Sequence, residues 1–522
     1  MNDTAPRTSN FGKWMALTAA LLGWLFDGLE MGLFPLVQRS ALKELVGDEQ
    51  LTLWMGIMTS FFLVGAATGG VLFGWLGDRI GRVRSMMLSV LTYALVSGLC
   101  GFAADLHIGA VFIPGSWQIG ILRFIAALGM GGEWSLGVAL INEIWPDRSR
   151  AFLAGLIGAA ANVGYLIIGV VGSTVQQQLQ AIRHALLALN LSQEWVDHLI
   201  SEQNQGWRVL MMLGAVPALL TFFIRVFVPE SEKWERERGK GATSHWATRD
   251  LLSVLGGAIA ACLIIVLWAV QFELYFDTDA RAAMAPWILT MRIVGSLAGF
   301  AIVTWGYTYP VLCYLKRAHA SGPVAGHDWK PALKRMLLAA TLSGVALLGT
   351  WGTIQQAPAW STTLAHTEPT AAAQTQIAAA FGAVIGTIIA ALLGGWLGRR
   401  ITYFFLCIAS FVILQIFFQP SAAFGNYFLF LAFLTGGISA SFYGWLPLYL
   451  PELFPTAFRA TGQGFGFNFG RIIAAIGVLQ LQNLREAFGG LPQACAALSC
   501  IYVVGLIVIW FVPETKGKPL PD

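Results

Sequence analysis

Long apolar segments follow one another along almost the whole of this 522-residue chain. A helix needs about 20 apolar residues to cross a lipid bilayer. About fourteen segments meet this requirement, near 12–37, 51–76, 84–104, 112–143, 151–174, 207–228, 250–271, 285–316, 333–357, 375–398, 401–418, 424–450, 458–480 and 493–512. We therefore predict an all-α membrane protein with about 14 transmembrane helices.

The composition agrees with a membrane protein. Charged residues make up 11% of the chain, whereas soluble domains carry about 25%. The net charge of +4 is small and the basic residues lie in short loops, a pattern that sets orientation and gives no reason to expect nucleic-acid binding. The six cysteines lie in or beside apolar segments without the spacing of a metal site or a disulfide framework.

Basic residues concentrate in alternate connections between the apolar segments. These connections contain Arg79, Arg82, Arg84, Arg148, Arg150, Lys233, Arg236, Arg238, Lys240, Lys316, Arg317, Lys330, Arg399 and Arg400. Cytoplasmic loops of membrane proteins are enriched in lysine and arginine. We therefore predict that both termini lie in the cytoplasm. The long polar segment 175–206 falls on the opposite side, where we expect a short amphipathic cap.

The two ends of the chain repeat each other. Residues 143–151 and 452–460 both read Glu-x-x-Pro-x-x-x-Arg-Ala, and residues 227–231 match 511–515. A further match aligns Gly77 with Gly398. These repeats predict two six-helix halves related by an axis along the membrane normal. The expected division is 1–228 for the first half, 229–332 for a cytoplasmic linker with two extra transmembrane helices, and 333–522 for the second half.

Several motifs resemble those of the major facilitator superfamily. Residues 74–82 follow the pattern Gly-x-x-x-Asp-Arg-x-Gly-Arg of the loop between its second and third helices. Pro-Glu-Ser at 229–231 and Pro-Glu-Thr-Lys-Gly at 513–517 resemble its sugar-porter-like and metabolite:proton symporter branches. The segments 25–30 and 129–134 are similar to bacterial sialic-acid:proton symporters. The resemblance implies a multi-pass protein of the bacterial inner membrane that works as a monomer without a cofactor.

Asp27 and Glu30 are candidates for proton coupling, because ionisable groups inside a membrane are costly and need a reason. Lying three residues apart, they share one helix face, and repulsion between them favours protonation of one. The alternative is a structural pair satisfied by Arg123 or by backbone donors. Glu133 lies about 15 Å from Arg123 along the same helix. It is expected to face another helix, either in proton coupling or in structural pairing.

Arg123 and Arg471 are candidate contacts for an anionic substrate, because a guanidinium binds a carboxylate through two parallel hydrogen bonds. Arg123 can instead hold Asp27, Glu30 or Glu133 in the ionised form. Further candidates for the wall of the substrate cavity are Asn162, Tyr165, Gln355, Gln356, Tyr443, Trp445 and Asn468. For these polar and aromatic side chains, ordinary packing is the alternative.

A third group of charged residues falls at the cytoplasmic helix ends. It consists of Asp78, Arg82, Glu143, Arg150, Glu452 and Arg459. The family resemblance implies that these residues form a gate that latches the two halves together; the alternative is charge that only sets topology. Arg399 stands where the second half often keeps an acidic residue, which argues against a symmetric charge cluster.

The function predicted from these features is secondary active transport. The expected substrate is a small organic acid, such as a sialic acid or another carboxylate, moved by proton-coupled alternating access. A sugar or other metabolite symporter or facilitator, or a non-transporting sensor on the same scaffold, are the alternatives. The sequence contains no phosphate-binding loop and no convincing nucleophile–base arrangement, so we expect neither an ATP-driven pump nor an enzyme. The expected partners are the substrate, protons and the lipid bilayer.

Overall fold

The fold is a bundle of long helices. The computed structural model describes residues 10–109, 111–145, 149–200, 206–270, 272, 278–320, 329–365, 368, 370–419 and 422–521. Within these residues, thirteen helices are long and apolar enough to cross a membrane. The only strands in the described part of the chain are β1 (Leu106–Ile108) and β2 (Val111–Ile113), which pair antiparallel in a loop. The predicted all-α membrane architecture is thus confirmed.

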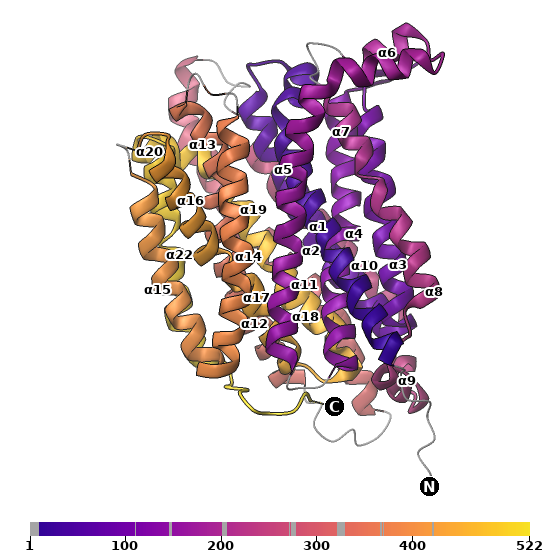
Figure 1. Cartoon of the computed structure of the whole chain (residues 1–522). Coiled ribbons are helices and arrows are strands. Elements are labelled where there is room, and N and C mark those ends of the chain that lie inside the picture. The colour runs from indigo at the N-terminus through magenta and orange to yellow at the C-terminus, as the bar shows by residue number, and fades with distance from the viewer. Residues whose placement is uncertain are drawn as a thin grey trace.

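The first six predicted segments correspond to helices in the N-terminal part of the chain. These are α1 (Asn10–Val46), α2 (Leu51–Ile80), α3 (Arg82–Leu99) with η1 (Cys100–Phe102), α4 (Gly115–Ile144), α5 (Arg150–Ala188), and α7 (Trp207–Leu213) continued by η3 (Val216–Leu219) and α8 (Leu220–Phe227). The short α6 (Gln193–Leu199) caps the end of the bundle opposite to the one where α1 begins (Figure 1).

The central part of the chain adds two long helices. It contains α9 (Glu232–Gly239), η4 (Ala242–His245), η5 (Thr248–Asp250), α10 (Leu251–Ala269) and α11 (Thr278–Ala320). Helices α10 and α11 pack against each other as an antiparallel pair, here called the inserted hairpin. Much of α11 is exposed, with Trp287 at 71% and Leu297 at 67% of their surface, as expected for a helix that faces lipid.

The C-terminal part completes the bundle. It contains α12 (Trp329–Trp351), η7 (Ile354–Gln356), α13 (Ala357–Leu364), α14 (Ala371–Leu397), α15 (Arg399–Phe417), α16 (Asn426–Ser439), α17 (Phe442–Tyr449), η8 (Leu450–Leu453), η9 (Thr456–Phe458), α18 (Arg459–Asn468), α19 (Gly470–Leu479), α20 (Leu481–Phe488), α21 (Leu491–Leu498), α22 (Ile501–Val508) and η10 (Ile509–Phe511). The last described residues lie at the same end of the bundle as α9 and the start of α1 (Figure 1).

The predicted segment 458–480 is not among the thirteen candidate membrane spans. It is present as α18 and α19, which are separated by Phe469. At this junction the Ile472 amide donates to the Phe469 carbonyl at 3.0 Å, a tightened turn of the 3₁₀ type. The predicted count of about 14 is one higher than the thirteen candidate spans, because this segment is not among them.

Helices from the two parts of the chain pack along two seams. At one seam α2 packs against α18 and α19, and at the other α5 packs against α14 and α17. Within the N-terminal part, α1 packs on α5 so closely that a Cβ on Gly28 would lie 1.7 Å from the Ala161 carbonyl oxygen. Small residues allow such close helix approach in membranes. This contact fixes the height of Asp27, the residue before Gly28.

Candidate functional site

An ion pair joins α1 to α4 inside the bundle. Glu30 accepts a hydrogen bond from Arg123, and both side chains are buried. The Arg123 guanidinium carbon also lies 4.6 Å from the ring centroids of Phe34 and Phe62, within the range of a cation–π interaction. Of the partners considered for Arg123 in the sequence analysis, the structure selects Glu30.

A pair of buried carboxyl groups lies one helical turn of α1 away from this ion pair. Asp27 interacts electrostatically with Glu133 of α4, and both side chains are buried. Glu133 lies against α1 at Gly23, where an added Cβ would come within 1.6 Å of its Oε1 atom. Neither oxygen of Glu133 meets the geometry of a hydrogen bond with a described residue, nor does the Tyr93 hydroxyl beside it. The close carboxyl pair therefore joins two helices as Asp27–Glu133, whereas the sequence suggested Asp27–Glu30.

Arg471 of α19 brings a positive charge from the C-terminal part toward this carboxyl pair. It interacts electrostatically with Asp27 and donates to the Asn468 Oδ1 atom at 2.5 Å. Asn468 in turn donates to the Gly131 carbonyl of α4 at 3.0 Å, which ties the two parts of the chain together. No described carboxylate forms a salt bridge with Arg471. Buried charges are usually paired, so this guanidinium is available to an anion.

Amide and hydroxyl groups form a further cross-link between α5 and the C-terminal helices. Tyr165 donates to the Gln355 side-chain oxygen at 2.8 Å, and Gln376 of α14 donates to the Tyr165 carbonyl at 3.2 Å. Tyr443 and Thr350 share a hydrogen bond of 2.5 Å. Gln376 and Thr350 are not among the residues predicted from the sequence. A polar side chain within an apolar segment was the available signal, but it does not reveal which face of the helix is buried.

The remaining candidates for the cavity wall have local partners. Asn162 donates to the Gly158 carbonyl of its own helix at 2.8 Å, and Gln356 donates to the Trp351 carbonyl at 3.0 Å. Trp445 donates to the Arg399 carbonyl at 3.0 Å and packs against Tyr403, with ring centroids 4.7 Å apart. The structure therefore places Trp445 beside the charged helix ends and not beside Arg471.

Charged side chains interlock the two parts of the chain at the α9 end of the bundle. Glu143 accepts hydrogen bonds from Arg82 and Arg459, both at 3.1 Å, and from Ser231 at 2.5 Å. Arg82 and Glu143 belong to the N-terminal part, while Arg459 begins α18 in the C-terminal part. Asp78 completes this cluster by accepting from Arg82 at 2.6 Å.

A second cluster mirrors the first. Glu452 accepts hydrogen bonds from Arg399 and Arg150, both at 2.7 Å, and from Thr515 at 2.5 Å. All four arginines are the first residues of their helices. Each glutamate thus holds one arginine from its own half and one from the other half. Because a helix N-terminus already carries positive partial charge, each cluster depends on its glutamate.

This symmetry corrects the expectation for Arg399, whose counterpart is Arg82. Gly81 and Gly398 precede these arginines at φ 112° and 106°, a conformation that favours glycine. Each arginine also donates to the carbonyl five residues before it, at 2.7 and 2.9 Å. The sequence alignment of Gly77 with Gly398 was therefore displaced by one helical turn, because both loops repeat glycine at that spacing.

Asp78 has no equivalent in the second half, where Gly395 occupies the corresponding position and packs against Ala151. Asp78 accepts hydrogen bonds from the Thr461 amide at 2.8 Å and the Thr461 hydroxyl at 2.6 Å. Thr461 lies in the first turn of α18, where the helix dipole favours a negative charge. The α2–α18 seam thus carries a carboxylate clamp that the α5–α14 seam lacks.

Two glutamates in the flanking loops cap the arginine-bearing helices. Glu230 accepts from the Arg82 amide at 2.9 Å, and Glu514 accepts from the Arg399 amide at 3.1 Å. Burial raises the pKa of Glu230 above its usual value, although backbone N–H groups oppose this. Burial acts in the same direction on Glu514, but backbone N–H groups led by that of Arg400 outweigh it and lower the pKa.

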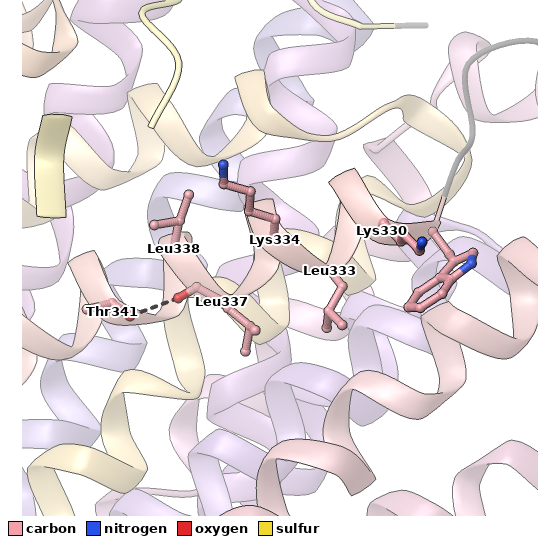
Figure 2. Close-up of a pocket in the computed structure, with 7 residues that line it drawn as sticks. Lys330, Leu333, Lys334, Leu337, Leu338 and Thr341 are labelled. Atoms are coloured by element: carbon pink, nitrogen blue, oxygen red, sulfur yellow. Dashed lines mark hydrogen bonds between the residues drawn. The ribbon is translucent and has the colours of Figure 1, made fainter. Parts of the chain in front are cut away.

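A groove of about 390 Å³ runs along one face of α12. Figure 2 shows its lining residues, which all come from this helix: Trp329, Lys330, Leu333, Lys334, Leu337, Leu338 and Thr341. A groove bounded by a single helix is open on its other sides. None of the buried carboxyl or guanidinium groups described above lines it, so it is not the candidate transport site.

The arrangement defines a class of protein. Paired helical bundles with buried charges at their centre and exchanged ion pairs at one end are features of major facilitator transporters, which are not enzymes. The family described as "Sugar (and other) transporter" matches residues 16–251 and 361–522, and the chain belongs to this family of the major facilitator superfamily. The part that is not matched contains most of the inserted hairpin.

Similar proteins are transporters of metabolites and organic acids. The cis,cis-muconate transport protein of Acinetobacter baylyi is 26% identical over 99% of this chain and 98% of its own. The inner membrane metabolite transport protein YgcS of Escherichia coli is 27% identical over 95% of this chain and 90% of its own. The solved structure of the proton:xylose symporter XylE shares the fold, with a TM-score of 0.63, 18% identity and 98% coverage of both chains.

Proposed function

We propose that this protein moves a small organic carboxylate together with protons by alternating access across the bacterial inner membrane. The observation that carries the proposal is Arg471, a buried guanidinium without a carboxylate partner among the described residues, opposite Asp27. The muconate transporter among the relatives supports a carboxylate substrate, and the inner membrane relative supports the location. A sialic acid is one member of this substrate class.

Competition for Arg471 can couple the substrate to the proton. When Asp27 is ionised it attracts Arg471, and when Asp27 is protonated this attraction is lost. A substrate carboxylate can then bind Arg471 through two parallel hydrogen bonds. Glu133 shares the buried site with Asp27 and is the second position for the proton. Proton and anion binding thereby favour each other, which is a coupling free energy between two sites.

In this proposal the two halves, 1–228 and 333–522, rock against each other around the buried charges. The Glu143 and Glu452 clusters keep the α9 end closed and open it by exchanging cross-half hydrogen bonds for water. Arg123 has a supporting role, because it already holds Glu30. Tyr165, Gln355 and Tyr443 line the seam between the halves and contact the uncharged part of the substrate. Protein of this kind is expected to act as a monomer.

A neutral sugar is the second candidate substrate, and one observation favours it. The cross-link of Tyr165, Gln355 and Gln376 offers hydroxyl and amide groups of the kind that bind sugar hydroxyl groups. This candidate makes no use of Arg471. The two proposals therefore differ in what substitution of Arg471 does.

Uptake into proteoliposomes with an imposed pH gradient tests the proposal. The substrates are cis,cis-muconate, a sialic acid and xylose, for wild type, Arg471→Gln and the control Arg485→Gln, which changes an exposed arginine of α20. We expect gradient-driven accumulation of a carboxylate, lost in Arg471→Gln and kept in the control. Accumulation of xylose alone, unaffected by Arg471→Gln, would establish the sugar alternative. No transport of any solute, with intact binding, would favour a sensor.

A further inference from the structure

Three aromatic residues form a stripe on the inner face of the inserted hairpin. Phe300, Tyr307 and Tyr314 lie seven residues apart on α11, which corresponds to two helical turns and places them on one face. Tyr307 and Tyr314 are buried, whereas other aromatic residues of the same helix, such as Trp305, are exposed. The stripe is therefore the side of α11 that contacts the rest of the protein.

The stripe contacts both ends of α18. The Tyr314 ring centroid lies 6.3 Å from that of Phe458, the residue before α18 begins. The Phe300 and Tyr307 ring centroids lie 5.4 and 6.4 Å from that of Phe469, the residue after α18 ends. These are distances of favourable aromatic pairs. The hairpin thus brackets the helix that carries Arg459 at one end and Asn468 at the other.

Phe469 is the junction residue between α18 and α19. It follows Asn468 directly and precedes Arg471 by two residues. The turn tightens at this point, which is a common feature of functional hinges. A contact that restrains Phe469 therefore also restrains the direction in which the Arg471 side chain leaves the helix.

Tyr307 links the same point to the N-terminal half. Its hydroxyl lies 2.6 Å from the Thr68 Oγ1 atom of α2, and both side chains are buried. Thr68 donates its own proton to the Val64 carbonyl at 2.8 Å, so Tyr307 is the donor in the bond between them. One side chain of the hairpin thus contacts α2 with its hydroxyl and the α18–α19 junction with its ring.

The position of Tyr307 is set by the hairpin itself. A Cβ on Gly257 of α10 would lie 2.7 Å from the Tyr307 ring, so the two helices meet closely at this level. Ser253 of α10 donates to the Gly306 carbonyl at 3.0 Å, which fixes the neighbouring residue. The hairpin can therefore act as a rigid support for the Tyr307 side chain.

We propose that Tyr307 is a positioning residue for transport, whose ring supports Phe469 and thereby the Arg471 side chain, and whose hydroxyl holds α2 against the α18–α19 junction and thereby favours the closed α9 end. This inference rests on the proposed function. The hairpin contacts both ends of α18 through its three aromatic residues, and it packs against α2 through α10 and through the hydrogen bond from Tyr307 to Thr68, so separation of α2 from α18 has to break one of these two sets of contacts. The hairpin is then a brace across one seam, which explains why two helices outside the matched family region pack at that position.

Tyr307→Phe and Thr68→Val each remove this hydrogen bond and keep most of the packing volume. The readout is hydrogen–deuterium exchange of the backbone at 70–80 and 459–468, together with counterflow of cis,cis-muconate in proteoliposomes. Each variant should raise exchange in both segments roughly fivefold, the factor expected for one hydrogen bond. The double variant should raise exchange by no more than either single variant does, because both substitutions remove the same contact. Tyr309→Phe, on another face of α11, is the matched control.

A ring contact can be tested separately from the hydroxyl group. Tyr307→Leu should also raise the KM for a carboxylate several-fold, because Phe469 and Arg471 lose their support, whereas Tyr307→Phe should leave the KM unchanged. Exchange equal to that of wild type in Tyr307→Phe, with an unchanged thermal midpoint, would overturn the proposal, and so would additive effects in the double variant. If wild type transports no solute, the exchange data still decide whether the brace exists, and only the proposed function fails.

Discussion

Arg150 and Glu452 come from opposite halves of the chain, and their side chains meet at 2.7 Å at the α9 end of the bundle. Arg459 and Glu143 form the reciprocal pair at 3.1 Å. Each half therefore supplies one arginine and one glutamate to the other. Such reciprocal pairs are broken together when the halves separate, which suits a gate that is either closed or open.

The clamp formed by Asp78 is the first feature to test. Asp78→Asn should weaken the charge-assisted hydrogen bonds to Thr461, which favours opening of the α9 end and slows return to the closed state. We expect about tenfold slower transport, from a loss of about 1.4 kcal/mol, with substrate binding largely intact. Uptake and equilibrium binding should be measured beside Asp48→Asn, an exposed control. Loss of binding in a folded Asp78→Asn variant would argue against a gate role.

The two carboxyl groups that we propose for proton coupling, Asp27 and Glu133, can be tested separately from Glu30, which pairs with Arg123. Asp27→Asn and Glu133→Gln should abolish uptake driven by a pH gradient and retain counterflow, which needs no net proton movement. Glu30→Gln should instead lower the yield of folded protein, because it leaves Arg123 buried without its partner. Uptake and counterflow in proteoliposomes, with the exposed Glu49→Gln as control, measure this difference. Full accumulation in both Asp27→Asn and Glu133→Gln would show that this pair does not couple.

The proposed contact for the substrate carboxylate is Arg471. Arg471→Lys keeps the charge but loses the two parallel hydrogen bonds of a guanidinium, so the Kd of a carboxylate substrate should rise about tenfold or more. The Kd of a neutral ligand should change much less. Binding to purified protein, followed by thermal stabilisation, gives both values. An equal loss of affinity for charged and neutral ligands would show that the substitution disturbs folding and not carboxylate recognition.

The two capping glutamates predict opposite pH dependence of stability. The lowered pKa of Glu514 means that its ionised form stabilises the fold above the ordinary value of 4.5, and this contribution is lost as pH falls through the lowered pKa. The raised pKa of Glu230 means that its contribution is present below 4.5 and is lost as pH rises through the raised value. Thermal midpoints of Glu514→Gln and Glu230→Gln relative to wild type should therefore change with pH in opposite directions.

The basic loops predict the orientation in the membrane. We expect Arg238→Cys, in α9, to react with a membrane-impermeant thiol reagent only from the cytoplasmic side. The variant is best made in a background without Cys500, which is the exposed native thiol among the described residues. Labelling from outside in intact cells would reverse the predicted topology.

The sequence by itself determined the membrane class, nearly all of the spans and the charged residues at the helix ends. Helix length and hydropathy are local properties, so a segment such as 84–104 identifies itself. Repeated motifs such as Glu143–Arg150 and Glu452–Arg459 also survive in the linear order. The junction at Phe469 was not predicted, because Phe469 has helical dihedral angles. The tightened turn is visible only in the backbone hydrogen bond from Ile472 to Phe469, which spans three residues in place of four.

Only the tertiary structure decided which partner each buried charge has. Asp27 and Glu30 lie on one helix face, yet Glu30 pairs with Arg123 while Asp27 meets Glu133 and Arg471. Partner choice inside the bundle depends on how far one helix is shifted along another, and a shift of one turn, about 5.4 Å, exchanges every partner. Close contacts such as that of Gly28 with Ala161 set these shifts, and they exist only after the helices have packed.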